Sequence, residues 1–245
     1  MVITSRNNEL IKSVRALRQK KGRDEQNAFI VEGEKLVDEA IKTGQIIKNI
    51  FVTEKYAQKY ERFNPVLVSE SVLSCLVDEV TPQGVLAVVQ IPKSGAITPL
   101  THCLLLDRVQ DPGNVGAILR IAVACGIKQI LVIDCADAYS PKVVRASMSG
   151  IFKVNIVKID ETSAIALLRD NNLPLIVADM KGDNLFEFNP PSGFCLCVGN
   201  EGNGISQNLK SVASHKISIP MQGELESLNV AVATGVALYT LLNHK

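Results

Sequence analysis

The stretch Phe194–Ser206, FCLCVGNEGNGIS, joins an apolar run to a glycine-rich run and is the most informative part of the chain. This order predicts a buried strand that ends in a turn over Gly199–Gly204. The turn nearly matches the phosphate-binding pattern G-x-x-x-x-G-K-[ST], but Ile205 stands where that pattern needs a lysine. The glycines also run in the reverse of the dinucleotide-binding order. The sequence therefore argues against a nucleotide bound through either pattern. Two interpretations of the glycine-rich stretch remain: it binds another ligand, or it is only a turn whose backbone needs glycine.

Length and composition describe an ordinary soluble globular protein. The chain has 245 residues, enough for two domains, with 47% hydrophobic residues and a formal net charge of +1. It contains no uncharged apolar run of the roughly 18 residues that a membrane helix needs. Its N-terminus is polar and does not resemble a signal peptide. These features predict a cytoplasmic location and no membrane partner.

Cysteine and histidine are placed without the spacing of a metal site. The six cysteines form no C-x-x-C pair, and most lie in apolar runs, where cysteine behaves as a small buried hydrophobe. The three histidines are scattered along the chain. We therefore expect neither a metal cofactor nor disulfides.

A stretch rich in Pro, Gly and Ser near residues 91–101 separates two apolar runs and predicts a linker. We expect a first domain over 1–92, a linker over 93–101 and a second domain over 102–245. In the first domain, strand-like and helical runs alternate, which is typical of a small α/β unit. In the second, apolar runs alternate with helical segments, as a parallel sheet covered on both faces requires. The predicted fold class is therefore α/β.

The expected elements can be written as ranges. The strands are 28–31, 49–53, 66–69 and 85–90 in the first domain, and 103–107, 129–134, 153–158, 175–179, 194–198 and 217–219 in the second. The helices of the first domain are 34–42, 54–60 and 71–76.

The N-terminal end is basic although the whole chain is almost neutral. Residues 1–23 carry seven Lys and Arg residues against the single acid Glu9. Leu10, Val14 and Leu17 recur at helical spacing, which predicts one amphipathic helix with a cationic outer face and a cationic C-terminal tail. Phosphate contact would explain the charge. A solvated helix with basic residues at its C-terminal end explains it equally well.

Three loops of the second domain carry polar residues that a simple connection does not need. They are 107–116, which precedes a helix bearing Arg120; the glycine-rich turn with Glu201; and 217–229, which leads into a long apolar helix. Capping gives each a plain explanation: Asn114 and Ser227 as N-caps, and Glu201 as an acceptor for the helix start that follows. In an open α/β sheet, however, ligands bind beyond the carboxyl ends of the strands, where these loops could converge.

Together the three loops resemble the three motifs of the SpoU/TrmH-type RNA ribose 2′-O-methyltransferases of the SPOUT superfamily. The matching residues are Asp107, Gln110, Asp111, Pro112, Asn114, Gly116 and Arg120 in the first motif, Gly199, Glu201, Gly202 and Gly204 in the second, and Pro220, Met221, Gly223, Ser227, Leu228 and Asn229 in the third. Upstream, residues 29–33 and the helix after them resemble the substrate-binding domain of ribosomal protein L30e type. The chain departs from the family at Ile121, Ala231 and Ser149-Gly150, where Thr, Ser and Gly-Ala are usual.

The resemblance implies a fold and a cofactor. The fold is a parallel-sheet domain with a deep trefoil knot, preceded by the small L30e-like domain. The cofactor is S-adenosylmethionine, bound in a bent form between the second and third loops. The cofactor-binding candidates are Gly199, Asn200, Gly202, Ile219, Met221 and Leu228. Glycine lets the backbone approach the adenosyl group, and the three apolar side chains suit a neutral purine better than a phosphate.

The resemblance also implies a reaction, attack of a ribose 2′-oxygen of RNA on the sulfonium methyl group. The catalytic candidates are Asn114, Arg120, Glu201, Ser227 and Asn229. A guanidinium is a poor proton acceptor, so Arg120 more plausibly grips a phosphate or stabilises the developing alkoxide than acts as the base. The RNA-binding candidates are Arg15, Arg18, Lys20 and Arg145. Family members are homodimers that build the site at their interface, so a second copy is an expected partner.

Three other functions compete with rRNA methylation. A tRNA 2′-O-methyltransferase would share the catalytic domain, but the front half favours rRNA as the substrate. A non-catalytic RNA-binding protein with a vestigial cofactor pocket would bind RNA without methyl transfer, and the complete Arg120, Glu201 and Asn229 set argues against it. A small-molecule methyltransferase would not need the basic N-terminal segment.

Overall fold

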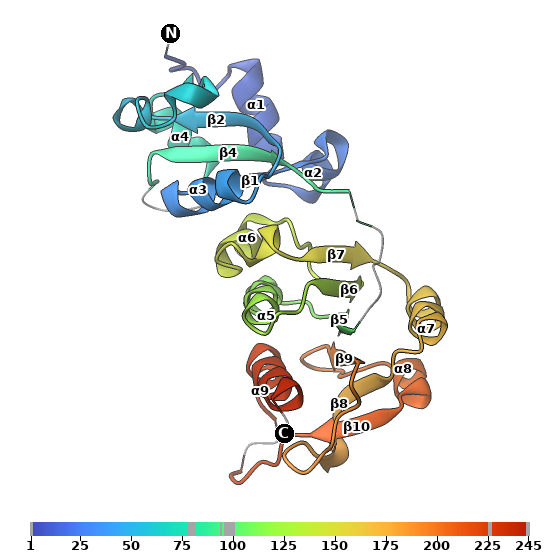
Figure 1. The fold of residues 1–245 in the computed structure, drawn as a ribbon. Coiled ribbons are helices and arrows are strands. Elements are labelled where there is room, and N and C mark those ends of the chain that lie inside the picture. Colours follow the sequence, from blue (N-terminus) through green and yellow to red (C-terminus); the bar gives the residue numbers. More distant parts are fainter. Residues whose placement is uncertain (1, 78–81, 94, 96–100, 225–226, 244–245) are drawn as a thin grey trace. The chain divides into compact units, whose positions relative to one another are not determined.

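The computed structural model describes residues 2–77, 82–93, 95, 101–224 and 227–243, which form two compact units (Figure 1). The first unit is Met1–Lys93 with Asp137–Phe152, and the second is Ser94–Ala136 with Lys153–Lys245. Most of the expected linker, 93–101, lies outside the described residues. Residues 137–152, which the sequence places in the second domain, pack with the first unit instead.

The first unit is built on a mixed four-stranded sheet in the order β1-β4-β2-β3. Its strands are β1 (Ala28–Glu32), β2 (Ile47–Val52), β3 (Val66–Leu67) and β4 (Val85–Gln90). Its helices are α1 (Glu9–Ala16), α2 (Lys20–Gln26), α3 (Glu34–Lys42), α4 (Glu70–Leu76) and α6 (Pro141–Ala146), with short 3₁₀ turns η1 (Glu54–Tyr56), η2 (Glu61–Phe63) and η3 (Gly150–Phe152). The helix expected over 54–60 is therefore only a 3₁₀ turn at its beginning.

The basic N-terminal segment folds as two helices, so the expectation of one continuous helix is wrong. Ile11, Val14 and Leu17 are buried, as the helical spacing predicts. The chain then turns, and Gly22 of α2 lies so close to α1 that a Cβ atom there would be 2.2 Å from the carbonyl oxygen of Ala16. Arg23 donates to the carbonyls of residues 17 and 18 and so satisfies groups left open where α1 ends.

Residues 137–152 join the first unit through two ion pairs and an aromatic cluster. Arg23, only 4% exposed, places Nη2 2.6 Å from Oδ2 of Asp137. Arg145 of α6 places Nη1 3.2 Å from Oε2 of Glu32. The ring of Phe29 packs against the rings of Tyr139 and Phe152. The Arg23 side chain therefore forms a buried ion pair within the first unit. It is one of the seven basic residues counted over 1–23, but its charge is neutralised by Asp137.

The second unit is an open parallel sheet in the order β10-β8-β9-β5-β6-β7, which confirms the predicted fold class. Helices α5 and α9 cover one face and α7 and α8 the other (Figure 1). The strands are β5 (His102–Asp107), β6 (Gln129–Ile133), β7 (Asn155–Lys158), β8 (Leu175–Asn184), β9 (Phe194–Gly199) and β10 (His215–Ser218). The helices are α5 (Pro112–Ala124), α7 (Glu161–Asp170), α8 (Gln207–Val212) and α9 (Val230–Leu242).

Strand register places the polar loops beside one another. β5 and β9 are neighbours and end together, with Asp107 paired to Gly199. The first polar loop and the glycine-rich turn therefore leave the sheet at the same edge. Cys103, Cys195 and Cys197 are buried in these two strands, as expected for cysteines in apolar runs. The trefoil knot and the L30e-like character of the first unit stay predictions.

Among the described residues, no helix has the length and apolar character needed to cross a bilayer.

Backbone strain is concentrated just after α6. Met148 and Ser149 both have positive φ, 47° and 73°. The left-handed conformation costs a non-glycine residue about 1–2 kcal/mol, whereas glycine costs about 0.5–1 kcal/mol in chain entropy. We expect Ser149→Gly to raise the free energy of unfolding by about 0.5–1 kcal/mol in a urea titration. Ser149→Ala is the control and should not stabilise the protein; equal gains in both variants would contradict the assignment to strain.

Candidate functional site

One asparagine ties the three polar loops together. Asn114, which the sequence places in the loop after β5 and the structure in the first turn of α5, donates from Nδ2 to Oε1 of Glu201 at 2.8 Å. The Oδ1 atom of Asn114 accepts from Nδ2 of Asn229 at 2.9 Å. Glu201 belongs to the turn after β9, and Asn229 to the loop after β10. The convergence predicted for the carboxyl ends of these strands is therefore confirmed, with one residue from each loop in the chain of hydrogen bonds.

The N-caps fall on different residues from those expected. Asp111, not Asn114, caps α5, because its Oδ1 accepts from the backbone N–H of residue 114 at 2.9 Å. Asn229, not Ser227, caps α9 through bonds from the N–H groups of residues 231 and 232. Asn229 thus uses Oδ1 for the helix and Nδ2 for Asn114. The side chain of Asn114 is left for the contact between loops.

Glu201 holds the first loop rather than the helix that follows it. Its carboxylate accepts from Asn114 and, at 3.4 Å each, from the backbone N–H groups of Gln110 and Asp111. The helix that follows, α8, is capped by Ser206 instead. Burial raises the pKa of Glu201, but the hydrogen bond from Asn114 and the backbone contacts outweigh burial and hold that pKa below its usual value. The carboxylate is therefore ionised at neutral pH.

The glycine-rich turn closes on itself. Backbone hydrogen bonds join Asn200 and Gly204 in both directions, and Gly204 has a φ of 66°. The side chain of Asn200 accepts from the N–H groups of residues 202 and 203. A Cβ atom on Gly199 would lie 2.5 Å from the backbone of Gly204. Position 199 therefore needs glycine for the close approach of the two ends of the turn.

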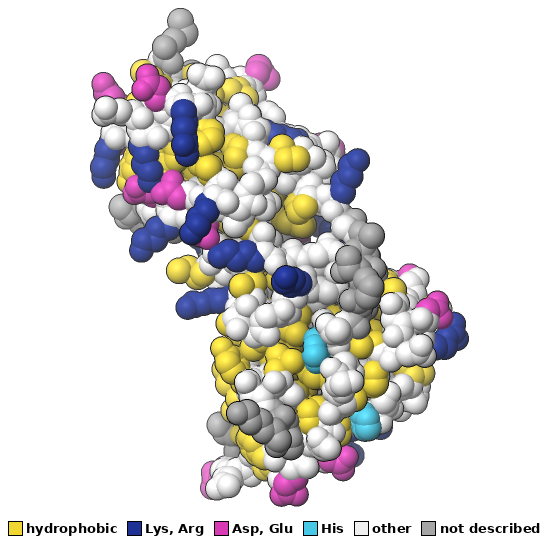
Figure 2. All heavy atoms as spheres, viewed as in Figure 1, with side chains coloured by type: hydrophobic (Ala, Val, Ile, Leu, Met, Phe, Trp, Pro, Cys, Tyr) yellow, Lys and Arg dark blue, Asp and Glu magenta, His cyan; other side chains and the backbone are white. Residues whose placement is uncertain are grey.

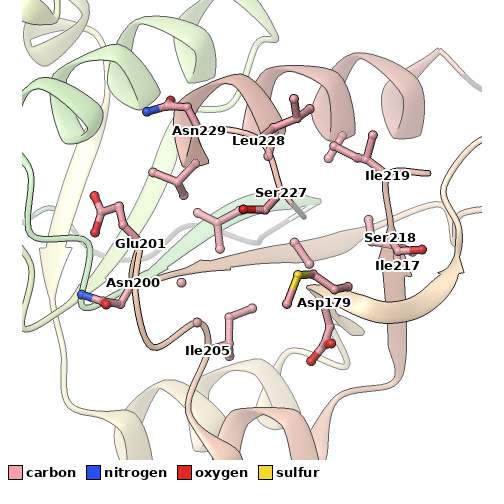
Figure 3. Close-up of a pocket in the computed structure, with 18 of the residues that line it drawn as sticks. Asp179, Asn200, Glu201, Ile205, Ile217, Ser218, Ile219, Ser227, Leu228 and Asn229 are labelled. Carbon is pink, nitrogen blue, oxygen red and sulfur yellow. The ribbon is translucent and has the colours of Figure 1, made fainter. Parts of the chain in front are cut away.

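A cavity of about 750 Å³ opens between the glycine-rich turn and the loop before α9 (Figure 3). Its size is that of a pocket for a cofactor-sized ligand. All six cofactor-binding candidates line it: Gly199, Asn200, Gly202, Ile219, Met221 and Leu228. Three catalytic candidates, Glu201, Ser227 and Asn229, line it as well. Figure 3 shows Glu201 and Asn229 on the same side of the pocket, with Ile219 across from them.

The middle of β8 adds two pocket residues that sequence reasoning missed, Asp179 and Met180. The Asp179 carboxylate lies 2.7 Å from Nζ of Lys210 in α8. The hydrogen bond from Lys210 has the largest influence on the pKa of Asp179. Together with a bond from the backbone N–H of Lys181, it holds that pKa below its usual value. Met180 is 72% exposed. The rule applied to the other loops, polar residues at the carboxyl end of a strand, would have found Asp179, because the predicted strand ends there.

Arg120 and the four RNA-binding candidates do not line this pocket. Arg120 is exposed on α5 and is not among the residues that line the cavity. Arg15, Arg18 and Lys20 are exposed in the first unit, where Figure 2 shows many Lys and Arg side chains at the surface. Arg145 is paired with Glu32. Within the described ranges, no group of three or more His, Cys, Asp or Glu side chains could hold a metal ion.

Family models match both halves of the chain. The model of the SpoU rRNA Methylase family matches residues 101–239. The model of the MRM3-like substrate binding domain matches residues 8–87.

Relatives of similar length are also named as rRNA methyltransferases. The chain is 32% identical over 244 residues to the 23S rRNA (guanosine(2553)-2′-O)-methyltransferase RlmP of Bacillus subtilis (strain 168), covering 98% of each protein. It is 27% identical to the 23S rRNA (uridine(2479)-2′-O)-methyltransferase of Streptomyces viridochromogenes, covering 99% of this chain and 92% of the relative. Among solved structures, the AdoMet-bound rRNA methyltransferase from Sinorhizobium meliloti superposes with a TM-score of 0.91 at 32% identity, covering 100% of this chain and 98% of that one.

Proposed function

The chain belongs to the SpoU rRNA methylase family, and we propose that it methylates a ribose 2′-hydroxyl of ribosomal RNA. It is an RNA 2′-O-ribose methyltransferase that uses S-adenosylmethionine as methyl donor. The observation that carries this function is the hydrogen-bonded chain Glu201–Asn114–Asn229 beside a cofactor-sized pocket. The rRNA relatives of similar length favour rRNA over tRNA as the substrate.

The residues of the pocket fit S-adenosylmethionine. One wall of the pocket exposes bare backbone, because Gly199 and Gly204 have no side chains. Another wall is apolar and includes Ile219 and Leu228. Such a slot suits a neutral purine with backbone amides at its edge. When bound, the cofactor supplies an activated methyl group with a good leaving group, so the protein mainly has to align the reacting atoms.

The chain's own residues then perform the alignment. Asn114 keeps the three loops in register through its contacts with Glu201 and Asn229. Ser227 presents a hydroxyl on the pocket wall for the substrate ribose or the cofactor. Arg120 binds the phosphate next to the reacting ribose or stabilises the developing alkoxide, which a permanently charged fork of N–H donors does well.

A second copy of the chain completes the site in this proposal. Arg120 is the single charged residue of α5, is exposed and does not line the cavity of its own chain. The neighbouring helix α9 carries no charged residue, yet Val232 and Tyr239 are about half exposed on it. An uncharged helix face of this kind suits a homodimer interface, and the partner's pocket would then receive Arg120.

The function is tested by methyl transfer to RNA. Purified protein with labelled S-adenosylmethionine should transfer label to rRNA from cells that lack the protein. It should transfer none to rRNA from cells that contain it, because the target 2′-oxygen is already methylated there. Mapping of 2′-O-methyl sites in total RNA would then identify the nucleotide and separate rRNA from tRNA. Calorimetric binding of S-adenosylmethionine and of RNA without any transfer would support the non-catalytic alternative instead.

The basic N-terminal residues should contribute to RNA affinity through phosphate contacts. We expect replacement of Arg15, Arg18 and Lys20 by glutamine to weaken RNA binding and to reduce the slope of log affinity against log salt by about 2–3, since each phosphate contact contributes about 0.7–0.9. The measurement is fluorescence anisotropy across a salt series. Exposed residues of the second unit, Lys128, Lys158 and Arg169, give a control with the same charge change. Equal losses in both triple variants would reduce the effect to net charge.

A further inference from the structure

Arg108 directly follows strand β5, at the beginning of the first polar loop, and has an unusual backbone. It is not among the residues that line the pocket. Its φ is 58°, in the left-handed region that favours glycine. Its N–H donates to the carbonyl of Ile133 at the end of β6, at 2.8 Å. An arginine kept in a costly conformation needs contacts that hold it there.

The guanidinium of Arg108 bridges two carboxylates. It lies 2.9 Å from the carboxylate of Asp107, which is fully buried, and 3.7 Å from that of Glu161 at the beginning of α7. Hydrogen bonding by Asp107 raises the pKa of Arg108, and the arginine stays charged. The group therefore neutralises two acids that would otherwise face one another at the end of β5.

Both carboxylates hold the far end of the glycine-rich turn. Oδ2 of Asp107 accepts from the backbone N–H of Ser206 at 2.7 Å. Glu161 accepts from Nδ2 of Asn208 at 2.7 Å, and a hydrogen bond from the Ser206 hydroxyl lowers the pKa of Glu161. Asp107 and Glu161 thus both bind Ser206, the residue at which the glycine-rich turn passes into α8.

The near end of the same turn is held by the Arg108 backbone. Nδ2 of Asn200 donates to the carbonyl oxygen of Arg108 at 2.8 Å. The same Asn200 side chain organises the N–H groups inside the turn through its oxygen. Arg108 therefore contacts the turn at its beginning through its own carbonyl, and at its end, Ser206, through Asp107 and Glu161.

We propose that Arg108 is a positioning residue for the cofactor, which sets the shape of the turn 199–206 without touching the ligand. The proposal rests on S-adenosylmethionine binding in the pocket. Arg108 is not among the lining residues, whereas Gly199 and Asn200 are. The Arg108 side chain is 42% exposed, but the side chain of its partner Asp107 is fully buried, so removal of the guanidinium is expected to lower the free energy of unfolding as well. A positioning role adds a loss of cofactor affinity in the folded protein, which a purely structural role would not produce.

Arg108→Gly tests the proposal, because glycine keeps the positive φ and the carbonyl contact with Asn200 while it removes the guanidinium. We expect calorimetry on the folded variant to show the Kd for S-adenosylmethionine rising about tenfold, as loss of one charge-assisted contact predicts. The melting temperature should fall as well, because the buried Asp107 loses its counter-charge. In steady-state assays the KM for the cofactor should rise while kcat at saturation and the KM for RNA stay near wild type. Arg108→Lys should recover part of the affinity. Arg169→Ala, which removes an exposed arginine paired with Asp170 on α7, is the control and should bind as wild type does.

The outcomes separate this proposal from the proposed function. If wild-type protein does not bind S-adenosylmethionine, the function itself is wrong. If wild type binds and Arg108→Gly binds equally tightly, the positioning role is wrong. If Arg108→Gly does not fold, Glu161→Gln decides: it keeps the side-chain shape but loses the charge, so an unchanged Kd would overturn the proposal and a weakened one would support it.

Discussion

Replacement of Arg120 by alanine should abolish methyl transfer, with kcat lower by about 10²–10³, the usual loss when one group that stabilises developing charge is removed. Arg120→Lys should retain little activity, since an ammonium lacks the planar fork of N–H donors that matches a phosphate. Because the proposed role of Arg120 is to contact the RNA phosphate or the developing alkoxide and not the cofactor, its loss should leave the Kd for S-adenosylmethionine unchanged. The measurements are single-turnover transfer to rRNA and calorimetry with the cofactor.

Mixed dimers would locate the pocket that Arg120 serves. We expect each of two variants to be inactive alone. Arg120→Ala lacks the guanidinium, and the side chain of Gly199→Val meets the backbone of Gly204 and distorts the pocket. After subunit exchange, the mixture should recover about a quarter of wild-type activity, the share of intact sites in random symmetric dimers. No recovery would place Arg120 in the site of its own chain. Wild-type turnover by Arg120→Lys would contradict the role of the guanidinium.

Asn114→Asp should be the most damaging near-isosteric change in the pocket region. Asparagine donates to Glu201 and accepts from Asn229 at the same time, and an ionised aspartate accepts only. Asp at 114 would set two carboxylates against each other, one of which is already ionised at neutral pH. The loops should separate, and kcat/KM for methyl transfer should fall by about 10²-fold, the usual effect of a small misplacement of reacting groups.

Two measurements support the interpretation of Asn114→Asp. Cofactor affinity should fall together with kcat/KM, because the loops on both sides of the pocket shift. Asn64→Asp, at an exposed position of the first unit, adds the same charge and should be neutral. Activity of Asn114→Asp that recovers at low pH, where the new carboxyl is protonated and donates again, would strengthen the repulsion argument. Full activity at neutral pH would show that the link between loops is unnecessary.

Elements with strong local patterns agree closely between sequence and structure. The helix 34–42 and the strand 85–90 begin and end where the pattern of apolar residues predicts. Strand β8, by contrast, runs five residues beyond its predicted end at Asp179, to Asn184, because pairing with β10 carries it through polar residues. The expected helix at 54–60 is only a 3₁₀ turn at its beginning. Pairing partners, which local propensity does not contain, decide such cases.

The amino-acid sequence by itself determined the α/β class and the order of the loops, since apolar periodicity and glycine spacing are local properties. The candidate residues of the pocket wall came from the resemblance of the three motifs to the SpoU/TrmH-type family. Tertiary structure alone decided that Asp111 and Asn229 are the caps, that Asn114 joins three loops and that Arg23 is buried against Asp137. The caps are local contacts, but Asn114 and Arg23 each had a local role open to them as well as a remote partner. The remote one prevails when the packed sheet brings it within hydrogen-bonding distance, and that distance depends on the whole chain.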